Sequence, residues 1–336
     1  MNTLKEKSGN ILELKEVSKF YGYGLLSRVR FTAVDSVTLS LGNKPQIFTL
    51  AGESGSGKTT LAKIALGIIR PSKGEVLFKG KSLWKLNNVD RKDFIRNVQP
   101  VFQDPYDTFN PFEKIENYLF NTAKYVKGLE GGRSVLDLVE SKLSITGLNY
   151  SDIKNKKPRE LSGGQLQRLA IARALIAEPK VIIADEPVSM IDVSLRIGIL
   201  NIFKKIKYEN KVSILYITHD LATAYYIADS AAIMFRGSIV EQGDIESIIK
   251  DPLHPYTREL IDSIPDPERG VWLTTDAKRQ VVELREFSAR GCKYAYACPY
   301  VTNVCKSRAP PLMETRSGHY VSCWLYHSAP PNTDED

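Results

Sequence analysis

QIFTLAGESGSGKTTLAKIALGII, residues 46–69, is the stretch of sequence that decides the fold. Its first six residues form a short apolar run typical of a buried strand, and residues 59–69 carry apolar side chains at helical spacing. Between them, GESGSGKT at residues 52–59 fits the pattern GxxxxGK followed by Ser or Thr. This pattern between a strand and a helix predicts a phosphate-binding loop (P-loop) and half of a βαβ unit.

The loop offers several groups that suit a polyphosphate. Its glycines let successive backbone N–H groups face the phosphates, and the helix that follows adds a partial positive charge. Lys58 can reach the outer phosphates, and Thr59 can ligate Mg²⁺. The alternative, a Gly-rich turn with a surface lysine, would have to match four fixed positions and both flanking elements by chance. The predicted contacts are Gly52, Ser54, Gly55, Ser56, Gly57, Lys58, Thr59 and Thr60.

Two adjacent carboxylates end a second apolar run. In VIIADE, Asp185 and Glu186 follow a nearly all-apolar segment of the kind found in a parallel strand covered on both faces. Buried carboxylates are costly unless they meet a cation or hydrogen-bond donors. Beside a P-loop, an Asp at this position can hold Mg²⁺ through its shell, and an adjacent Glu can accept the proton of the attacking water. An acidic cap on the next helix is the structural alternative.

A second anion-binding feature begins at Leu161 with LSGGQLQRLAIARAL. A Ser and two glycines directly before a strong helix can be an ordinary N-cap. They can equally bind an anion, because the hydroxyl and the free N–H groups point away from the helix start. The residues concerned are Ser162, Gly163, Gly164 and Gln165.

Composition limits the classes of protein. The 336 residues suggest about two domains, and 43% hydrophobic with 25% charged residues excludes collagen-like, coiled-coil and wholly disordered chains. The net charge of +7 suits polyphosphates, anionic lipids or nucleic acid without choosing among them. The sequence contains no run of 18 apolar residues, so no membrane span is predicted. The charged N-terminus does not resemble a signal peptide, so we expect the protein to lie in the reducing cytoplasm.

The pattern along the chain predicts two parts. Strands are expected over residues 11–21 and 31–41, a helical insertion over about 102–165, parallel strands at 180–187 and 213–220, and a hairpin over 231–243. Beyond Pro252 the periodicity fades. We therefore expect one domain over 1–264 and a C-terminal extension over 265–336.

The four cysteines, Cys292, Cys298, Cys305 and Cys323, lie in the last 45 residues. Their spacing is not that of paired CxxC zinc knuckles, and spacing alone favours zinc and an iron–sulfur cluster equally. Their clustering with Gly, Pro and Tyr disfavours unconnected core thiols. His319 could replace one ligand, although a histidine after a loop glycine is more often solvated.

The order and spacing of GESGSGKT, Gln103, LSGGQ, VIIADEP and His219 resemble the nucleotide-binding domains of ABC transporters over residues 11–264. The resemblance implies an α/β fold of the P-loop NTPase (RecA-like) type, with a parallel sheet, an antiparallel β subdomain and a helical insertion. It also implies a head-to-tail dimer in which the LSGGQ segment of one subunit closes over ATP held by the P-loop of the other.

The same resemblance assigns roles to further residues. Gln103 would link Mg²⁺ and the attacking water to the insertion. Asp192 would lie in the loop that crosses to the partner, and His219 would contact the γ-phosphate. From position alone, His219 would more simply be a satisfied histidine at a strand end. Tyr21 would stack on adenine, although Phe20 is adjacent.

Two segments resemble the ATP-binding subunits of dipeptide and oligopeptide permeases: VFQDPYDTFNPFEKI at 101–115 and DPLHPYTRELIDSIPDP at 251–267. The resemblance implies an ATPase with Mg²⁺ on the cytoplasmic face of the membrane, with a second ATPase subunit and two transmembrane permease subunits. An extracytoplasmic substrate-binding protein would act indirectly, and no nucleic acid is expected. The tail resembles extensions that carry a 4Fe-4S cluster, which favours the cluster over zinc.

Other functions fit the sequence less well. An importer of oligosaccharides in the same family is the nearest alternative. A soluble ABC ATPase acting on DNA or ribosomes is disfavoured, because the chain has one cassette and no sustained heptads between its P-loop and LSGGQ. A non-hydrolysing regulatory subunit is disfavoured by the presence of Glu186 and His219.

Overall fold

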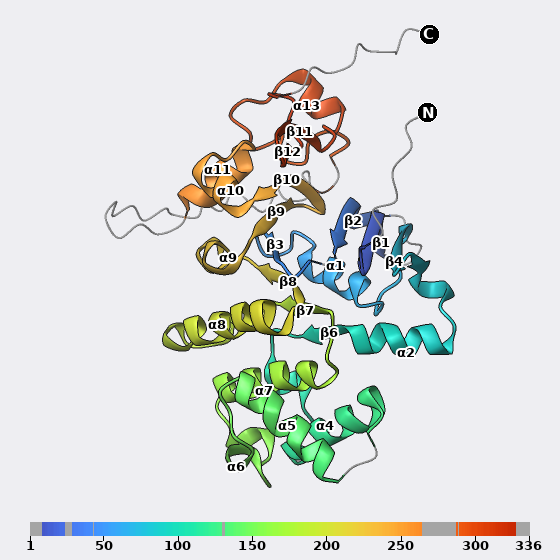
Figure 1. Ribbon diagram of the computed structural model, residues 1–336. Helices are drawn as coiled ribbons and strands as arrows, with labels where there is room; N and C mark the ends of the chain where they lie inside the picture. The colour runs from blue at the N-terminus through green and yellow to red at the C-terminus, as the bar shows by residue number, and fades with distance from the viewer. Residues whose placement is uncertain are drawn as a thin grey trace.

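The computed structural model describes residues 9–23, 29–42, 44–129, 132–263, 287 and 289–326. Within these ranges the strands form two sheets, in the orders β11-β12-β10-β9-β3-β8-β7-β6 and β2-β1-β4-β5 (Figure 1). The predicted α/β fold with an antiparallel subdomain is confirmed. The strands are β1 (Leu12–Tyr23), β2 (Val29–Leu41), β3 (Ile47–Ala51), β4 (Lys73–Phe78), β5 (Lys81–Ser82), β6 (Val98–Val101), β7 (Val181–Asp185), β8 (Ser213–Thr218), β9 (Ser230–Phe235), β10 (Ser238–Asp244), β11 (Met313–Arg316) and β12 (His319–Val321).

The helices lie around and between these sheets. Helices α1 and α2 lie near the antiparallel sheet, α5 and α7 belong to the insertion, and α8 lies on the core sheet (Figure 1). The helices are α1 (Lys58–Ala65), α2 (Asn88–Asn97), α3 (Pro105–Thr108), α4 (Ile115–Thr122), α5 (Arg133–Ile145), α6 (Tyr150–Ile153), α7 (Gly163–Ile176), α8 (Val193–Asn210), α9 (Leu221–Ile227), α10 (Ile245–Lys250), α11 (Pro255–Asp262) and α13 (Asn303–Ser307), with 3₁₀ turns at Leu83–Lys85 and Pro158–Glu160.

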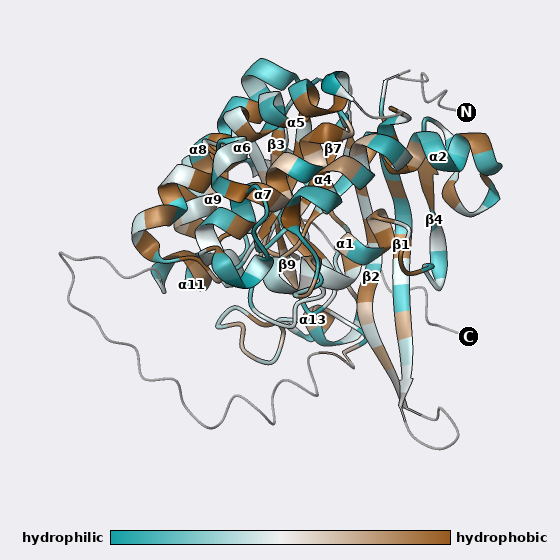
Figure 2. Ribbon diagram, turned by 90° about the horizontal axis from the view of Figure 1, so that it is seen from below, coloured by the Kyte–Doolittle hydropathy of each residue, from teal (hydrophilic) through white to brown (hydrophobic). Residues whose placement is uncertain are grey.

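The centre of the large sheet is parallel. β3 pairs in parallel with β8 on one side and β9 on the other, and β7 joins β8 to β6. All residues of β3, β7 and β8 are buried, which explains their uninterrupted apolar sequences, since helices cover both faces. Figure 2 shows apolar residues along β3 and β7 among helices that carry both polar and apolar residues. The register places the carboxyl ends of these strands at one edge.

The antiparallel sheet packs over α1. Buried residues of β1, β2 and β4 share one hydrophobic cluster with the apolar residues of α1. The two strands expected from residues 11–41 are confirmed as β1 and β2, which pair with each other from Leu12 opposite Leu41 to Tyr23 opposite Val29. This sheet therefore covers the helix that follows the P-loop.

The helical insertion is present and reaches further than residue 165. Within it, α4 is followed by one π-helical turn, Ala123–Lys127. Helix α7 buries residues in two clusters, one shared with the insertion and one with the core sheet. This double burial explains its nearly uniform apolar composition and makes α7 the join between the insertion and the core.

The C-terminal region departs from the expected loss of periodicity. Residues 255–262 form α11, and the hairpin of β11 and β12 extends the core sheet, with Val321 opposite Glu241 and Tyr320 opposite Gln242. The boundary expected at 264/265 falls within residues 264–286, which lie outside the described residues, so the division into two domains stays a prediction. No helix in the described ranges is long and apolar enough to span a bilayer.

Candidate nucleotide-binding site

The P-loop leaves the carboxyl end of β3 and is closely packed from two sides. Gly52 (φ 150°) and Gly57 (φ 106°) have backbone conformations that other residues rarely adopt. A Cβ at Gly52 would lie 2.2 Å from the carbonyl oxygen of Met234, and one at Gly57 would lie 2.1 Å from that of Ala33. Glycine is therefore required at both positions by conformation and by space.

Lys58 lies inside the loop rather than on the surface. Its ammonium group donates to the carbonyl oxygens of Gly52 and Glu53 at 2.8 and 2.7 Å, and the residue is 4% exposed. Burial lowers the pKa of Lys58, while the carboxylates of Glu186, Asp185 and Glu53 oppose that change. A buried lysine held inside the loop by carbonyl oxygens is placed to bind phosphates, and its burial excludes the alternative of a surface lysine on a turn.

Thr59 and Asp185, two of the three residues expected to serve Mg²⁺, lie together. The Thr59 hydroxyl, in the first turn of α1, donates at 3.3 Å to Oδ1 of Asp185, which ends β7. Asp185 is 7% exposed, and burial raises the pKa of its carboxyl group. A buried carboxylate beside a threonine hydroxyl fits the oxygen ligands that Mg²⁺ prefers.

Glu186 and His219 also meet at this edge. The Glu186 N–H donates to the Ile217 carbonyl at 2.9 Å, and its carboxylate lies 3.1 Å from His219 Nδ1. Glu186 has φ 45°, an uncommon conformation for a residue with a side chain. The His219 side chain is 51% exposed and has Glu186 as its partner, and its expected contact with the γ-phosphate stays a prediction. The arrangement places a carboxylate and an imidazole beside the P-loop.

Gln103 follows the end of β6 and is half-buried. A residue that was not predicted supports this segment: Gln167 on α7 is fully buried, and its amide donates to the carbonyl oxygen of Phe102 at 3.2 Å. Gln167 thus connects the helix after LSGGQ to the residue before Gln103. The sequence gives only a weak sign of this role, because Gln167 is a polar residue in a mostly apolar helix.

The LSGGQ segment forms a reciprocal cap. The Ser162 hydroxyl accepts from the Gln165 N–H at 3.3 Å, and the Gln165 side chain accepts from the Ser162 N–H at 3.0 Å. The structural role as an N-cap is confirmed. Gly163 and Gly164 are the first two helical residues, whose N–H groups have no acceptor within a helix. Figure 1 shows the starts of α1 and α7 in different parts of the molecule.

Asp192 and Tyr21 lie at exposed positions. Asp192 precedes α8, and Arg196 fixes the adjoining loop by donating to the Ile191 carbonyl at 2.9 Å. Tyr21, on β1, is 37% exposed, with the Lys19 ammonium 5.3 Å from its ring centre. Their accessibility suits the roles expected from the resemblance, and those roles stay predictions.

The four cysteines share one region without forming a ligand set. The Cys292 N–H donates to the Cys305 carbonyl at 2.7 Å. Burial raises the pKa of the Cys292 thiol to about 12, with smaller contributions from the other three thiols. Among the residues that the structure describes, no three His, Cys, Asp or Glu side chains are arranged to hold a metal ion.

His319 is not solvated, contrary to expectation. It is 4% exposed, and its Nε2 lies 2.8 Å from a carboxylate oxygen of Glu241, which is itself fully buried. The pairing of β12 with β10 accounts for this burial, because it carries His319 onto the sheet. A contact between residues so distant in sequence has no local signature.

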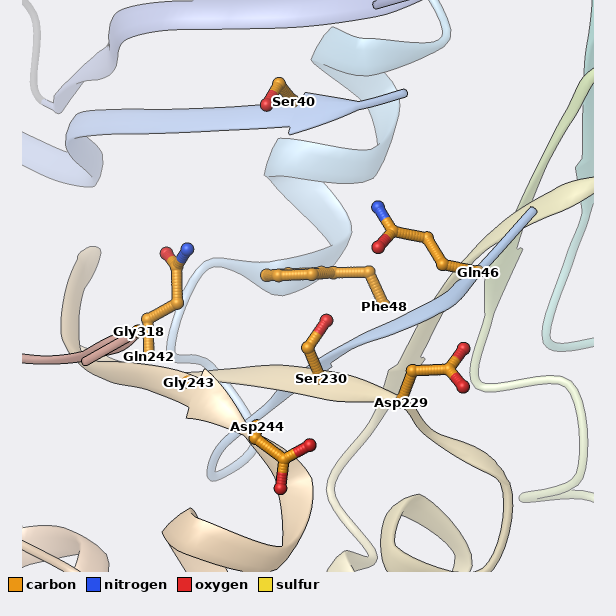
Figure 3. Close-up of a pocket in the computed structure, with 9 residues that line it drawn as sticks. All are labelled: Ser40, Gln46, Phe48, Asp229, Ser230, Gln242, Gly243, Asp244 and Gly318. Atoms are coloured by element: carbon orange, nitrogen blue, oxygen red, sulfur yellow. The ribbon is translucent and has the colours of Figure 1, made fainter. Parts of the chain in front are cut away.

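A polar pocket of about 320 Å³ lies at the opposite end of β3 from the P-loop (Figure 3). Gln46, Phe48 and Ser230 line it, together with Asp229. The Asp229 carboxylate accepts from the Ile47 N–H at 2.7 Å and from Lys207 at 2.5 Å. Because this carboxylate is already paired and lies away from the P-loop, the pocket is not part of the nucleotide site.

Comparison with known proteins agrees with this geometry. Residues 34–189 match the ABC transporter family, and residues 240–305 match the family described as oligopeptide/dipeptide transporter, C-terminal region. The oligopeptide transport ATP-binding protein AppF of Bacillus subtilis (strain 168) is 35% identical, over 94% of this chain and 97% of its own. The oligopeptide transport ATP-binding protein OppF of Salmonella typhimurium is 35% identical, over 87% of each chain.

Solved structures show the same fold. A dimeric, post-hydrolysis structure of the ATP-binding cassette MJ0796 bound to ADP and Pi has a TM-score of 0.61 and 27% identity, and covers 70% of this chain and 98% of its own. The structure of cbiO1 from Clostridium perfringens, part of the cbiONQ transporter complex, has a TM-score of 0.61 and 25% identity, over 72% and 92% of the two chains.

Proposed function

Because the chain belongs to the family of oligopeptide transport ATP-binding proteins, we propose that it hydrolyses ATP to power an ABC importer of oligopeptides or dipeptides. The observation that carries the ATPase assignment is the shared strand edge, where Lys58, Asp185 and Glu186 converge. The peptide assignment is supported by the match of residues 240–305 and by the names of the relatives.

Different residues of the site bind the phosphates, hold Mg²⁺ and accept the proton of the attacking water. Lys58 and the N–H groups of the P-loop bind the phosphates, and Thr59, Asp185 and Gln103 would hold Mg²⁺. Bound Mg²⁺ neutralises charge on the phosphates. Glu186 orients the attacking water and accepts its proton, since its carboxylate is held beside the P-loop.

The side chains around Glu186 complete this arrangement. His219, at 3.1 Å from that carboxylate, would keep it oriented and contact the terminal phosphate. Tyr21 would stack on adenine from β1. Each of these roles rests on position and on the resemblance to ABC nucleotide-binding domains.

We infer that the active form is a pair of ATPase subunits. The P-loop and the LSGGQ helix start lie apart within one chain, so an ATP bound at the first would meet the second from a partner (Figure 1). The MJ0796 cassette, a structural relative, is described as a dimer. The partner is a second copy or a related subunit, and Asp192 would lie at the contact.

The remaining partners follow from the transport role. Two transmembrane permease subunits would bind the pair at the cytoplasmic face of the membrane, and an extracytoplasmic binding protein would deliver the substrate to them. The transported molecule would not touch this chain, so its residues do not determine the substrate. An importer of oligosaccharides is therefore the alternative.

Reconstitution of the full chain with its permease subunits in lipid vesicles tests the function. We expect ATP-dependent uptake of a labelled tripeptide mixture in the presence of the binding protein, and loss of uptake in Lys58→Ala, which removes the phosphate-binding charge. Uptake of oligosaccharides alone would correct the substrate. ATP turnover that responds to DNA or ribosomes and not to the permease subunits would refute the transport assignment.

A 4Fe-4S cluster on Cys292, Cys298, Cys305 and Cys323, with zinc as the alternative, is our proposal for the tail. The backbone hydrogen bond from the Cys292 N–H to the Cys305 carbonyl, which brings two of the four cysteines together, supports it. Because the described side chains are not arranged as ligands, we assign the metal no step in hydrolysis. Anaerobically purified protein should be brown with about four iron atoms per chain, and Cys298→Ser should lose them while still binding ATP. The absence of both iron and zinc would refute the proposal.

A further inference from the structure

One side chain from the C-terminal half of the chain touches the P-loop itself. Tyr256 lies on α11, and its hydroxyl accepts a hydrogen bond from the backbone N–H of Glu53 at 3.1 Å. Glu53 is the second residue of the P-loop. Tyr256 lies within residues 240–305, the segment matched by the oligopeptide/dipeptide C-terminal region. The P-loop is thus contacted by a segment that lies outside residues 34–189, the part matched by the ABC transporter family.

The peptide group between Gly52 and Glu53 is bonded at both ends, to Lys58 through its carbonyl and to Tyr256 through its N–H. The carbonyl of Gly52 and the N–H of Glu53 belong to the same planar unit, and no cis peptide occurs among the described residues. Lys58 donates to that carbonyl at 2.8 Å, while the Tyr256 hydroxyl accepts from the N–H. The tyrosine therefore fixes the orientation of the peptide to which Lys58 is bound.

Tyr256 can fix this peptide because its own ring is immobilised. The residue is 2% exposed, and its ring centre lies 4.4 Å from that of Phe235 and 5.7 Å from that of Tyr294. Phe235 ends β9, which pairs directly with β3. The phenol is therefore held against β9, the neighbour of the strand from which the P-loop emerges.

The backbone of α11 is anchored as firmly as the ring. The buried carboxylate of Glu241, on β10, accepts from the N–H groups of Leu253 and His254 at 2.9 and 2.8 Å. His254 Nδ1 in turn accepts from the Tyr256 N–H at 3.1 Å. Pro255, at the first helical position, suits this start because it has no N–H to satisfy. The segment HPYT thus carries Tyr256 on a start that is bonded to the sheet.

We propose that Tyr256 is a positioning residue for nucleotide binding, which holds the Gly52–Glu53 peptide in the orientation that the phosphates require. The inference rests on the proposed ATPase function and gives the C-terminal region a part in it. Without the hydroxyl, this peptide can turn in the free protein, and binding must restore its orientation. Loss of the hydroxyl should therefore lower the affinity for ATP. The rate of hydrolysis, in which Glu186 accepts the proton of water, should not change.

Tyr256→Phe tests the proposal because it removes the hydroxyl and keeps the ring. We expect the Kd of the full-length chain for Mg-ATP, measured by calorimetry, to rise about fivefold, the effect of one lost neutral hydrogen bond. The kcat of the reconstituted transporter should stay within about twofold. Equal Kd values for the variant and the wild type would overturn the proposal.

Tyr326→Phe is the matched control. The Tyr326 hydroxyl accepts from Arg258 at 2.9 Å and donates to the Leu253 carbonyl at 3.0 Å, so its loss disturbs the same region without touching the P-loop. Its Kd for Mg-ATP should equal that of the wild type. Equal rises in both variants would mean general destabilisation and would overturn the proposal.

A second pair of variants isolates the bond itself. Glu53→Pro deletes the N–H donor, and Glu53 is not among the residues with positive φ. In that background Tyr256→Phe should change the Kd by less than about twofold, because the two residues of one bond are not additive. A full fivefold effect there would overturn the proposal. A wild-type chain that binds no Mg-ATP would instead refute the ATPase function.

Discussion

Replacing Glu186 by Gln removes the basicity of one carboxylate and keeps its shape. The amide oxygen that Glu186→Gln introduces can still accept from His219 Nδ1, which lies 3.1 Å from the present carboxylate. The backbone at φ 45°, held by the bond from its N–H to Ile217, suits either residue equally. The substitution therefore tests proton acceptance with little change in structure.

The expected loss follows from the role of a general base. A positioned base contributes about two to four decades in rate, and two decades correspond to about 2.7 kcal/mol of transition-state stabilisation. Because Glu186 lies beside the P-loop without bonding to it, ground-state binding should be spared. We expect turnover of the reconstituted transporter to fall at least about a hundredfold, while the Kd for Mg-ATP changes by less than about twofold.

Glu178→Gln is the matched control for this experiment. Glu178 also has positive φ, 50°, but it lies after α7 and pairs with Lys127 and Lys142 on the surface. Phosphate release at saturating ATP should be unchanged in this variant. Turnover of Glu186→Gln within about threefold of the wild type would refute the assignment of Glu186 as the base.

Three further predictions concern capping, burial and pH. Ser162→Asp should preserve the N-cap and ATP binding but abolish ATP-dependent dimerisation in light scattering, because a carboxylate would face the partner's phosphates; an unchanged ATP-dependent dimer would exclude LSGGQ from the interface. Glu241→Gln should lower the free energy of unfolding by about 2–4 kcal/mol, since an amide donor replaces an acceptor among buried donors; a change below about 0.5 kcal/mol would contradict this. Burial lowers the pKa of His254 from near 6.5 to about 4, so its stabilisation is present above pH 6.5 and lost as pH falls toward 4. Denaturation of His254→Asn, whose side chain can still accept from the Tyr256 N–H, should show up to about 3 kcal/mol less of this acid destabilisation than the wild type, and identical pH profiles would disprove it.

Local patterns predicted the parts of the site that are contiguous in sequence. The P-loop, VIIADE and LSGGQ each combine a fixed motif with a flanking strand or helix, so their positions and elements could be predicted before the fold was seen. The parallel strands were predictable for the same reason, because burial on both faces leaves continuous apolar runs such as residues 181–185.

Contacts between distant segments were not predictable. Tyr256 reaches Glu53, Gln167 reaches Phe102, and His319 reaches Glu241 only because strand pairing and helix packing bring them together. The hairpin of β11 and β12 was missed because its strands are only four and three residues long and β11 is largely exposed. Metal ligation in the tail depends on side-chain geometry, which the spacing of four cysteines does not determine.

The position of β3 in the sheet has a consequence for how the chain is made. Its two neighbours, β8 and β9, come from residues 213–235, so the strand that carries the P-loop has no partner until most of the chain has left the ribosome. Until then an apolar five-residue strand has two unpaired edges and invites chaperone binding or aggregation. Pairings of such long sequence separation also form slowly. The nucleotide site is therefore assembled late in synthesis, although its motif is encoded near the start of the chain.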